Sequence, residues 1–300
     1  MDFKVFTGIG FILGTALGSF TKVLSDRSLI KQGINGRSYC PKCKQVLYWY
    51  DLLPVLSYLF LKGRCRYCQG KIGKEYLFVE LLMGVLIAFI FYQAPYYNLF
   101  SNDYFKILLF VSDLVFKIFF VIVLISVALT DLKKMIIPDK IILPAIVISV
   151  IYFIINLAIK VIYVYIVLNQ TLIGKALISS TNYLQRHIIM LTEPFLYSIL
   201  AGIVIGAFFL SLIIITKGRG MGGGDVKLGA FLGLGLGLPY SLVALMLSFI
   251  SGSIVGLFFI FTGRKKIGQH IPFGPYLVLG SIVALFWGDR IIEWYLHLSV

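Results

Sequence analysis

Two Cys-x-x-Cys pairs are the residues whose spacing most strongly indicates a chemical site. Twenty-one residues separate the first pair, Cys40 and Cys43, from the second, Cys65 and Cys68. Four thiolates complete the tetrahedral coordination of Zn²⁺ and leave no position for substrate or water, so such a site organises a loop and does not catalyse. We therefore expect a structural Zn²⁺ on the four cysteines. Two disulfides or four unmetallated thiols are the alternatives.

Two aspartates are the candidates for acid and base chemistry. Asp131 follows a long apolar run, whereas Asp225 precedes another apolar run and comes directly after three glycines at 222–224. A carboxylate at the edge of the hydrocarbon is costly, so it is a functional candidate by default. Glycines remove side-chain bulk, which lets another chain approach the carboxylate. Two opposed aspartates can share one proton and activate water for amide hydrolysis.

Ordinary interfacial salt bridges are an equal alternative on spacing alone. Asp131 would then pair with Lys133 or Lys134. Asp225 would pair with Lys227. In that case the two acids would anchor helix ends and would have no part in catalysis.

The composition places these residues in a membrane protein. Hydrophobic residues make up 59% of the 300 residues and the mean hydropathy is +0.95. Charged residues make up 13%, against about 25% in an ordinary soluble domain. Soluble, disordered and collagen-like classes are thereby excluded. Four cysteines in this length are also too few for a disulfide-rich secreted scaffold.

Eight apolar runs are candidate membrane spans, because a spanning helix needs about 20 mostly apolar residues. They cover approximately residues 5–24, 76–94, 105–130, 138–159, 195–216, 228–238, 240–262 and 273–287. The run at 228–238 is short, and we expect it to tilt or to be re-entrant. Small residues in the first run favour close helix packing; they are Gly8, Gly10, Gly14 and Gly18. The predicted fold is an all-α polytopic membrane protein with about eight transmembrane helices and a small zinc-ribbon-like cytoplasmic loop.

The formal net charge of +14 is explained by loops on one face of the membrane. With the N-terminus outside, the inner segments are 22–75, 131–140, 217–227 and 263–272, and they hold 20 of the 27 Lys and Arg residues. The same segments contain the four cysteines and both aspartates. We therefore expect the chemistry at the cytoplasmic face, where thiols stay reduced, and we expect no nucleic-acid partner.

The order of the motifs resembles that of the bacterial type IV prepilin peptidases, which are membrane aspartic proteases with a G-x-G-D motif. The matching segments extend over most of the chain, at 18–20, 37–43, 51–59, 62–68, 79–80, 131–139, 220–227 and 271–275. The motif glycines are Gly222 and Gly224, since Met221 precedes them. Each motif is short, but together and in order they are specific.

The resemblance implies a function and roles for individual residues. Asp131 and Asp225 become the catalytic pair, one as general base toward water and the other as acid toward the amide. The substrates would be prepilins or pilin-like proteins, cut after a glycine at the cytoplasmic face of the bilayer, and the four cysteines would bind zinc. Family members often methylate the new N-terminus with S-adenosylmethionine. Gly70, Lys71 and Glu80 are the first candidates for binding this donor.

The resemblance also suggests a division of the chain. The first transmembrane helix covers residues 1–24, the four-cysteine loop 25–75, and the membrane peptidase core 76–300. An extracytoplasmic insertion near 161–194 is longer than the family pattern needs, and it has no assigned role. The protein is expected to be a multi-pass protein of the bacterial cytoplasmic (inner) membrane, with the lipid bilayer and prepilins or pseudopilins as its partners.

Two other classes of function place similar residues in a membrane. A proton-coupled transporter with a zinc-stabilised loop would also carry acids in its helices, but it would take up substrate and release no peptide. A non-catalytic scaffold would use the cysteine loop to bind a partner, and it would tolerate Asp131→Asn and Asp225→Asn. The peptidase hypothesis is favoured because both acids lie on one predicted face beside motifs of a single family.

Overall fold

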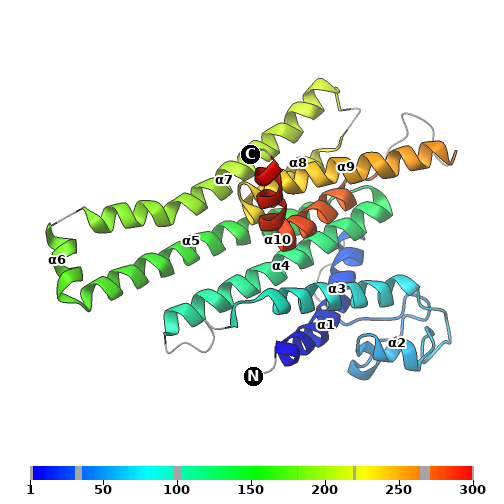
Figure 1. Ribbon diagram of the computed structural model, residues 1–300. Helices are drawn as coiled ribbons and strands as arrows, with labels where there is room; N and C mark the ends of the chain where they lie inside the picture. Colours follow the sequence, from blue (N-terminus) through cyan, green and yellow to red (C-terminus); the bar gives the residue numbers. More distant parts are fainter. Residues whose placement is uncertain are drawn as a thin grey trace. The chain divides into compact units, whose positions relative to one another are not determined.

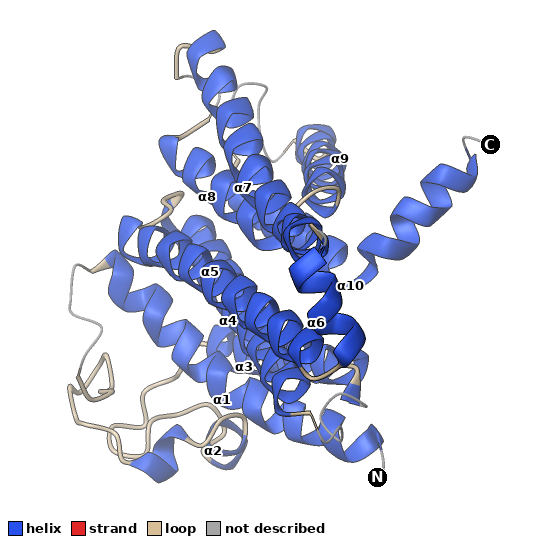
Figure 2. Ribbon diagram, turned by 90° about the vertical axis from the view of Figure 1, so that its left-hand side faces the viewer, coloured by secondary structure: helices blue, strands red, loops and turns tan. Residues whose placement is uncertain are grey.

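The computed structural model describes residues 3–30, 36–96, 103–180, 182–218, 221–263 and 271–298. Helices dominate these ranges, and Figure 2 shows no strand in them. The extended pairing found there consists of isolated bridges between Tyr39 and Val46 and between Arg64 and Lys71. The predicted all-α class is confirmed. The basic residues at 264–266 of the predicted inner segment 263–272, and Gly220 of the motif at 220–227, lie outside the described ranges.

Seven helices in the described part of the chain are long and apolar enough to cross a membrane. They are α1 (Phe3–Leu29), α3 (Lys74–Gln93), α4 (Tyr104–Lys134), α5 (Asp139–Asn169), α7 (Tyr183–Ile215), α9 (Tyr240–Phe261) and α10 (Gly274–Leu298) (Figure 1). The short predicted run forms α8 (Gly223–Leu236), a helix of 14 residues. It rises about 21 Å, less than the roughly 30 Å of hydrocarbon, so α8 does not span the bilayer alone.

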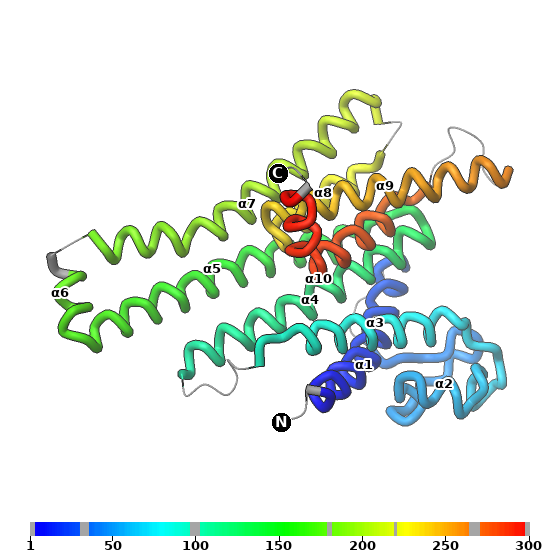
Figure 3. The backbone as a smooth tube through the Cα atoms, viewed as in Figure 1, coloured from blue at the N-terminus to red at the C-terminus, as the bar shows by residue number. Residues whose placement is uncertain are grey.

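The chain forms two compact units. One contains residues 1–95 and 117–130, and the other contains residues 96–116 and 131–300, so α4 contributes to both. In the first unit the segment between α1 and α3 contains a short 3₁₀ helix, η1 (Trp49–Leu52), and a short helix, α2 (Leu56–Phe60). Figure 3 traces this segment in lighter blue before the chain enters α3.

Helix α1 packs against α3 through the glycines that the sequence singled out. A Cβ atom on Gly14 would lie 2.6 Å from the carbonyl oxygen of Met83. A Cβ atom on Gly18 would lie 2.7 Å from the Cα atom of Glu80. The two backbones approach so closely that a larger residue would force them apart. The expected close packing of the first helix is therefore confirmed.

In the second unit α8 lies against α5, α7 and α10. Its side chains Leu228 and Phe231 are fully buried. A Cβ atom on Gly233 would lie 2.5 Å from the carbonyl carbon of Ala201 in α7, so small residues bring these two helices together. This packing fixes the start of α8, where Asp225 is found.

The segment near 161–194 is largely helical. Helix α5 continues to Asn169, and α6 (Leu172–Ser180) joins it to α7, which begins at Tyr183 (Figure 1). The span expected to begin near Phe195 therefore starts earlier. Pro194 lies inside α7 and does not end it. A proline removes one helical hydrogen bond, but neighbouring groups in a membrane protein can satisfy the freed carbonyl.

Candidate active site

Asp131 lies in the last turn of α4, and it is 6% exposed. Its Oδ2 atom accepts a hydrogen bond of 2.9 Å from the backbone N–H of Gly274, the first residue of α10. A Cβ atom at position 274 would lie 2.6 Å from the same oxygen. Only glycine lets the backbone come this close, so the Phe-Gly-Pro motif at 273–275 serves to hold the carboxylate of Asp131.

Asp225 lies in the first turn of α8, where the helix dipole favours negative charge. Its Oδ2 atom accepts a hydrogen bond of 3.2 Å from the backbone N–H of Gly222. Burial and the charge of Asp131 nevertheless raise the pKa of Asp225 to about 6, against the lowering effect of the Gly222 N–H. The carboxylates of Asp131 and Asp225 therefore interact electrostatically, and the pair retains a proton more readily than an isolated aspartate.

The three glycines before Asp225 have different surroundings. A Cβ atom on Gly224 would lie 2.9 Å from the Cβ atom of Ile137, so packing requires a glycine there. A Cβ atom on Gly222 or Gly223 would meet nothing within 4 Å. The backbone beside Asp225 is thus open at two of the three positions, as the approach of a substrate chain would require.

Lys227 pairs with an acid other than Asp225. Its Nζ atom lies 2.5 Å from Oδ1 of Asp139, the first residue of α5. Within the described ranges neither Asp131 nor Asp225 forms an ion pair with a lysine. The salt-bridge alternative is therefore not supported for either aspartate.

The four cysteines of the first unit form one cluster. Their sulfur atoms all lie within 4.8 Å of one another, and the Sγ atoms of Cys40 and Cys68 are 3.9 Å apart. Zn–S bonds of about 2.3 Å in a tetrahedron place sulfurs about 3.8 Å apart, so the cluster fits this metal. The two pairs form equivalent turns: the N–H of Cys40 donates to Gln45, and that of Cys65 donates to Gly70, both at 2.9 Å. All four thiols are free of disulfides.

The three residues expected to bind the methyl donor make contacts with different parts of the first unit. Gly70 closes the second cysteine turn, and a Cβ atom there would lie 2.7 Å from Cδ of Lys42. Lys71 lies in the bridge next to it and is exposed. Glu80, on α3, is 8% exposed and accepts a hydrogen bond of 2.7 Å from the backbone N–H of Val55. These contacts support the cysteine turn and α3 separately, and a role of the three residues in binding the methyl donor stays a prediction.

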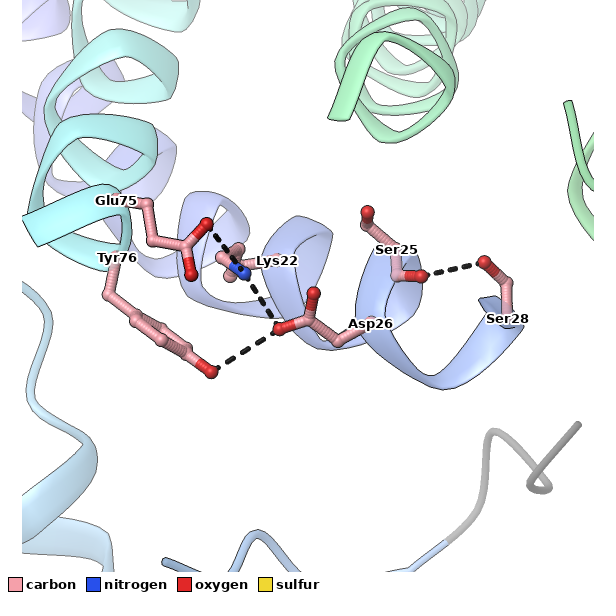
Figure 4. Close-up of polar contacts among 6 residues, drawn as sticks. All are labelled: Lys22, Ser25, Asp26, Ser28, Glu75 and Tyr76. Carbon is pink, nitrogen blue, oxygen red and sulfur yellow. Dashed lines mark hydrogen bonds and ion pairs between the residues drawn. The ribbon is translucent and has the colours of Figure 1, made fainter. Parts of the chain in front are cut away.

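An ion cluster around a buried lysine was not predicted from the sequence. Lys22, on α1, is fully buried, and its Nζ atom lies 2.7 Å from Oδ2 of Asp26 and 3.5 Å from Oε2 of Glu75 (Figure 4). The same ammonium lies 4.4 Å from the ring centroid of Tyr76, whose hydroxyl donates to Asp26 at 3.3 Å. The cluster joins the last third of α1 to the first turn of α3. The spacing of Lys22 and Asp26, four residues apart in an apolar helix, is the signal that could have identified it.

Comparison with known proteins gives matches over most of the chain. Residues 12–94 match the family model described as the bacterial peptidase A24 N-terminal domain, and residues 118–257 match the type IV leader peptidase family. A prepilin leader peptidase/N-methyltransferase of Bacillus subtilis (strain 168) is 31% identical over 97% of this chain and 98% of its own length. A protein of the same name from Legionella pneumophila is 30% identical over 87% of this chain and 75% of its own length. No solved structure matches.

Proposed function

This chain belongs to the type IV leader peptidase family, and on that premise we propose that Asp131 and Asp225 are its catalytic pair. The protein is a multi-pass membrane protease. Its substrates are prepilins or pilin-like proteins, from which it removes the leader peptide, as the names of its relatives state for those proteins. Two carboxyl groups at helix ends, each held by a backbone N–H, support the proposed site, and the charge of Asp131 acts on Asp225.

The surroundings of the two carboxyl groups suggest which one acts as the general base and which as the general acid. The Gly274 N–H donates to Asp131, a contact suited to the partner that is ionised, and the pKa of Asp225 is raised to about 6. We assign the shared proton to Asp225. Asp131 then accepts a proton from the attacking water, while Asp225 donates its proton to the amide as the tetrahedral intermediate breaks down.

The depth of the pair suits a substrate that crosses the membrane boundary. Asp131 ends a span and Asp225 begins a helix too short to span, so both lie at helix ends. A prepilin with a basic leader outside the hydrocarbon and an apolar helix within it would present its junction at this depth. We place the N-terminus outside and the pair toward the cytoplasm, because 20 of the 27 Lys and Arg residues then lie inside.

Methylation of the new N-terminus is the second activity that the family membership supports. The relatives carry the name prepilin leader peptidase/N-methyltransferase. S-adenosylmethionine, when bound, would supply the methyl group. We assign no residue to its binding, because the contacts of Gly70, Lys71 and Glu80 are accounted for by the cysteine turn and by α3.

We further propose that the cysteine cluster holds one structural Zn²⁺. Its donor set of four sulfur atoms within 4.8 Å of one another suits tetrahedral zinc and leaves no open coordination position. The metal would fix a segment whose regular structure is limited to η1, α2 and two isolated bridges.

Intact-mass analysis of a purified prepilin tests the catalytic pair. The substrate is incubated with membranes that contain the wild type, Asp131→Asn or Asp225→Asn, with and without S-adenosylmethionine. We expect one cut by the wild type and a loss of at least about 10³-fold in each variant, because each removes a proton-transfer group. With the methyl donor, the mature product should gain about 14 Da, one methylene.

Asp139→Asn is the matched control for these variants. Asp139 is also an aspartate at a helix end, but it is exposed and pairs with Lys227. Its substitution should leave the cleavage rate within about threefold, since exposed ion pairs contribute little. Cleavage at the wild-type rate by Asp131→Asn and Asp225→Asn would refute the proposed pair. Loss of cleavage in all three variants would show that the effect is not specific to Asp131 and Asp225.

A further inference from the structure

An exposed apolar ridge follows the first cysteine turn in the four-cysteine segment. It is made by η1 and α2, and its large side chains point away from the fold: Trp49 is 74% exposed and Phe60 is 84% exposed. The members of this ridge are Trp49, Leu52, Leu53, Leu56, Leu59 and Phe60. Six large apolar residues exposed within twelve positions are more than scattered surface residues explain, and such patches mark interaction sites.

The ridge is fixed beside a membrane-spanning helix. Val55, between η1 and α2, donates its backbone N–H to Oε2 of Glu80 at 2.7 Å. Glu80 lies six residues after Lys74, the start of α3, which places it about 9 Å along the helix. Its carboxyl group also accepts a hydrogen bond from the side chain of Ser19 on α1. The turn between η1 and α2 is therefore anchored to α3, on the part of that helix that also contacts α1.

The backbone at Val55 shows that this anchor is specific. Val55 has a φ of 59°, a conformation that a β-branched residue rarely adopts. Such a residue persists in this conformation where surrounding contacts impose it. The buried carboxylate of Glu80 is the contact that receives its N–H. The hydrogen bond to Glu80 thus holds the turn between η1 and α2 at α3.

The charge around the ridge is strongly positive. Residues 36–74 contain eight Lys and Arg residues and one acid, Asp51. The side chain of Asp51 is buried, and its oxygens accept hydrogen bonds from Nε of Arg66 at 2.8 Å and from the hydroxyl of Tyr67 at 3.0 Å. The ring of Tyr50 lies 4.9 Å below the Arg66 guanidinium. The one carboxylate of this segment is therefore directed inward, while Lys62 and Arg64 remain exposed close to the ridge.

We propose that the ridge is a membrane-binding surface that lies in the headgroup region of an anionic bilayer. Trp49 and Phe60 would enter the boundary between headgroups and acyl chains, where aromatic residues are favoured. Lys62 and Arg64 would contact lipid phosphates. A lipid surface is the occupant that matches both the position beside a span and the surrounding charge, so the four-cysteine segment rests on the membrane. This inference does not depend on the proposed catalytic pair.

Fluorescence of Trp49 in the full-length protein tests the surface. The sequence contains three tryptophans, and Trp287→Phe with Trp294→Phe leaves Trp49 as the one reporter. The protein is reconstituted in vesicles of phosphatidylglycerol and phosphatidylcholine, with the phosphatidylcholine brominated near its headgroup end. We expect about twofold quenching of Trp49 by the brominated lipid, together with protection from acrylamide, because an interfacial side chain contacts lipid and is shielded from water.

Lys62→Gln with Arg64→Gln in the single-tryptophan protein tests the contribution of charge. In these variants the dependence of quenching on phosphatidylglycerol content should weaken, because the contact with anionic phosphate is removed. Lys4→Gln is the matched control, because Lys4 is an exposed cation of the same unit that lies at the opposite end of α1. It should leave this dependence unchanged.

Two outcomes would overturn the inference. If Trp49 is quenched by acrylamide and not by brominated lipid, the ridge faces water. If it is protected from both quenchers, a protein partner or a second copy covers it. Photoreactive phosphatidylglycerol applied to the wild type gives an independent measurement, in which peptides from residues 49–60 should carry the label. Absence of label from these peptides would also contradict the proposal, and neither readout requires cleavage of a prepilin.

Discussion

The backbone N–H of Gly274 donates a 2.9 Å hydrogen bond to Oδ2 of Asp131, which lies 143 positions earlier in the chain. This contact joins the start of α10 to the last turn of α4 and orients one carboxylate of the proposed pair. It requires glycine, because a Cβ atom at position 274 would lie 2.6 Å from the accepting oxygen. The chemistry of an aspartic pair depends on such positioning, since an unoriented carboxylate cannot place the attacking water.

Gly274→Ala should therefore reduce cleavage without unfolding the protein. Loss of a hydrogen bond to a charged group costs about 1.5–3 kcal/mol, so we expect kcat/KM to fall by about 10- to 150-fold. Gly256→Ala is the control, because a Cβ atom there would meet its nearest neighbour, Ile271, at an ordinary 3.7 Å. Initial rates and thermal unfolding are measured on both variants. An unchanged rate for Gly274→Ala would show that the contact has no role in cleavage.

The pH dependence of cleavage should reflect the proton held by the pair. Burial and the charge of Asp131 raise the pKa of Asp225 to about 6. Below this pH Asp225 keeps the proton that it must donate; above it both carboxyls are ionised and the acid is lost. We expect kcat/KM to fall about tenfold per pH unit above the upper apparent pKa of the pair. A rate that stays level well into the alkaline range would contradict this assignment.

Local patterns in the sequence predicted much of the fold and the site. The spacing of the four cysteines predicted one cluster, and their sulfur atoms do lie together. Glycines four residues apart predicted close packing of the first helix, which Gly14 and Gly18 provide. Apolar runs predicted the spans because the length of a span is set by the bilayer. Each of these features depends on residues near one another in the chain or on the thickness of the bilayer.

Contacts between distant segments could not be predicted in the same way. Lys227 is two residues from Asp225, yet its amine lies 2.5 Å from Asp139, which is 88 positions away in the chain. Asp225 instead accepts a hydrogen bond from the N–H of Gly222 at the start of α8. The packing of α8 on α5 decides which acid meets the lysine. Spacing along the chain gives no information about such packing, so on spacing alone the salt bridges and the catalytic pair are equal alternatives.

Purified protein should contain one Zn²⁺ per chain, measured by elemental mass spectrometry. Cys40→Ser with Cys65→Ser removes the two buried ligands and should abolish binding. A strong chelator should lower the melting temperature of the wild type by about 5 °C or more, because the free energy of metal binding stabilises the fold. The same chelator should leave the melting temperature of the double variant unchanged. Metal-free wild type from zinc-supplemented cells would refute the site.

Replacement of Lys22 should be costly although the residue is far from the proposed chemistry in sequence. The ammonium of Lys22 is buried between Asp26 and Glu75 and over the ring of Tyr76 (Figure 4). Lys22→Met keeps most of the side-chain volume but leaves the two acids without this cation. The two acids left behind are partly exposed, with 25% and 48% of their side chains accessible, so water offsets part of the loss. Loss of hydrogen bonds to a charged group costs about 1.5–3 kcal/mol, and we expect a loss of stability of this size in thermal unfolding of the reconstituted protein.

Two further variants separate the charge of Lys22 from its packing. Lys4→Met removes an exposed lysine of the same helix and should change stability by less than about 0.5 kcal/mol. Addition of Asp26→Asn and Glu75→Gln to Lys22→Met should recover part of the lost stability, because a neutral cluster leaves no unpaired charge. If Lys22→Met is as stable as the wild type, the ion cluster does not hold α1 to α3. If the triple variant recovers nothing, the packing of the Lys22 side chain matters more than its charge.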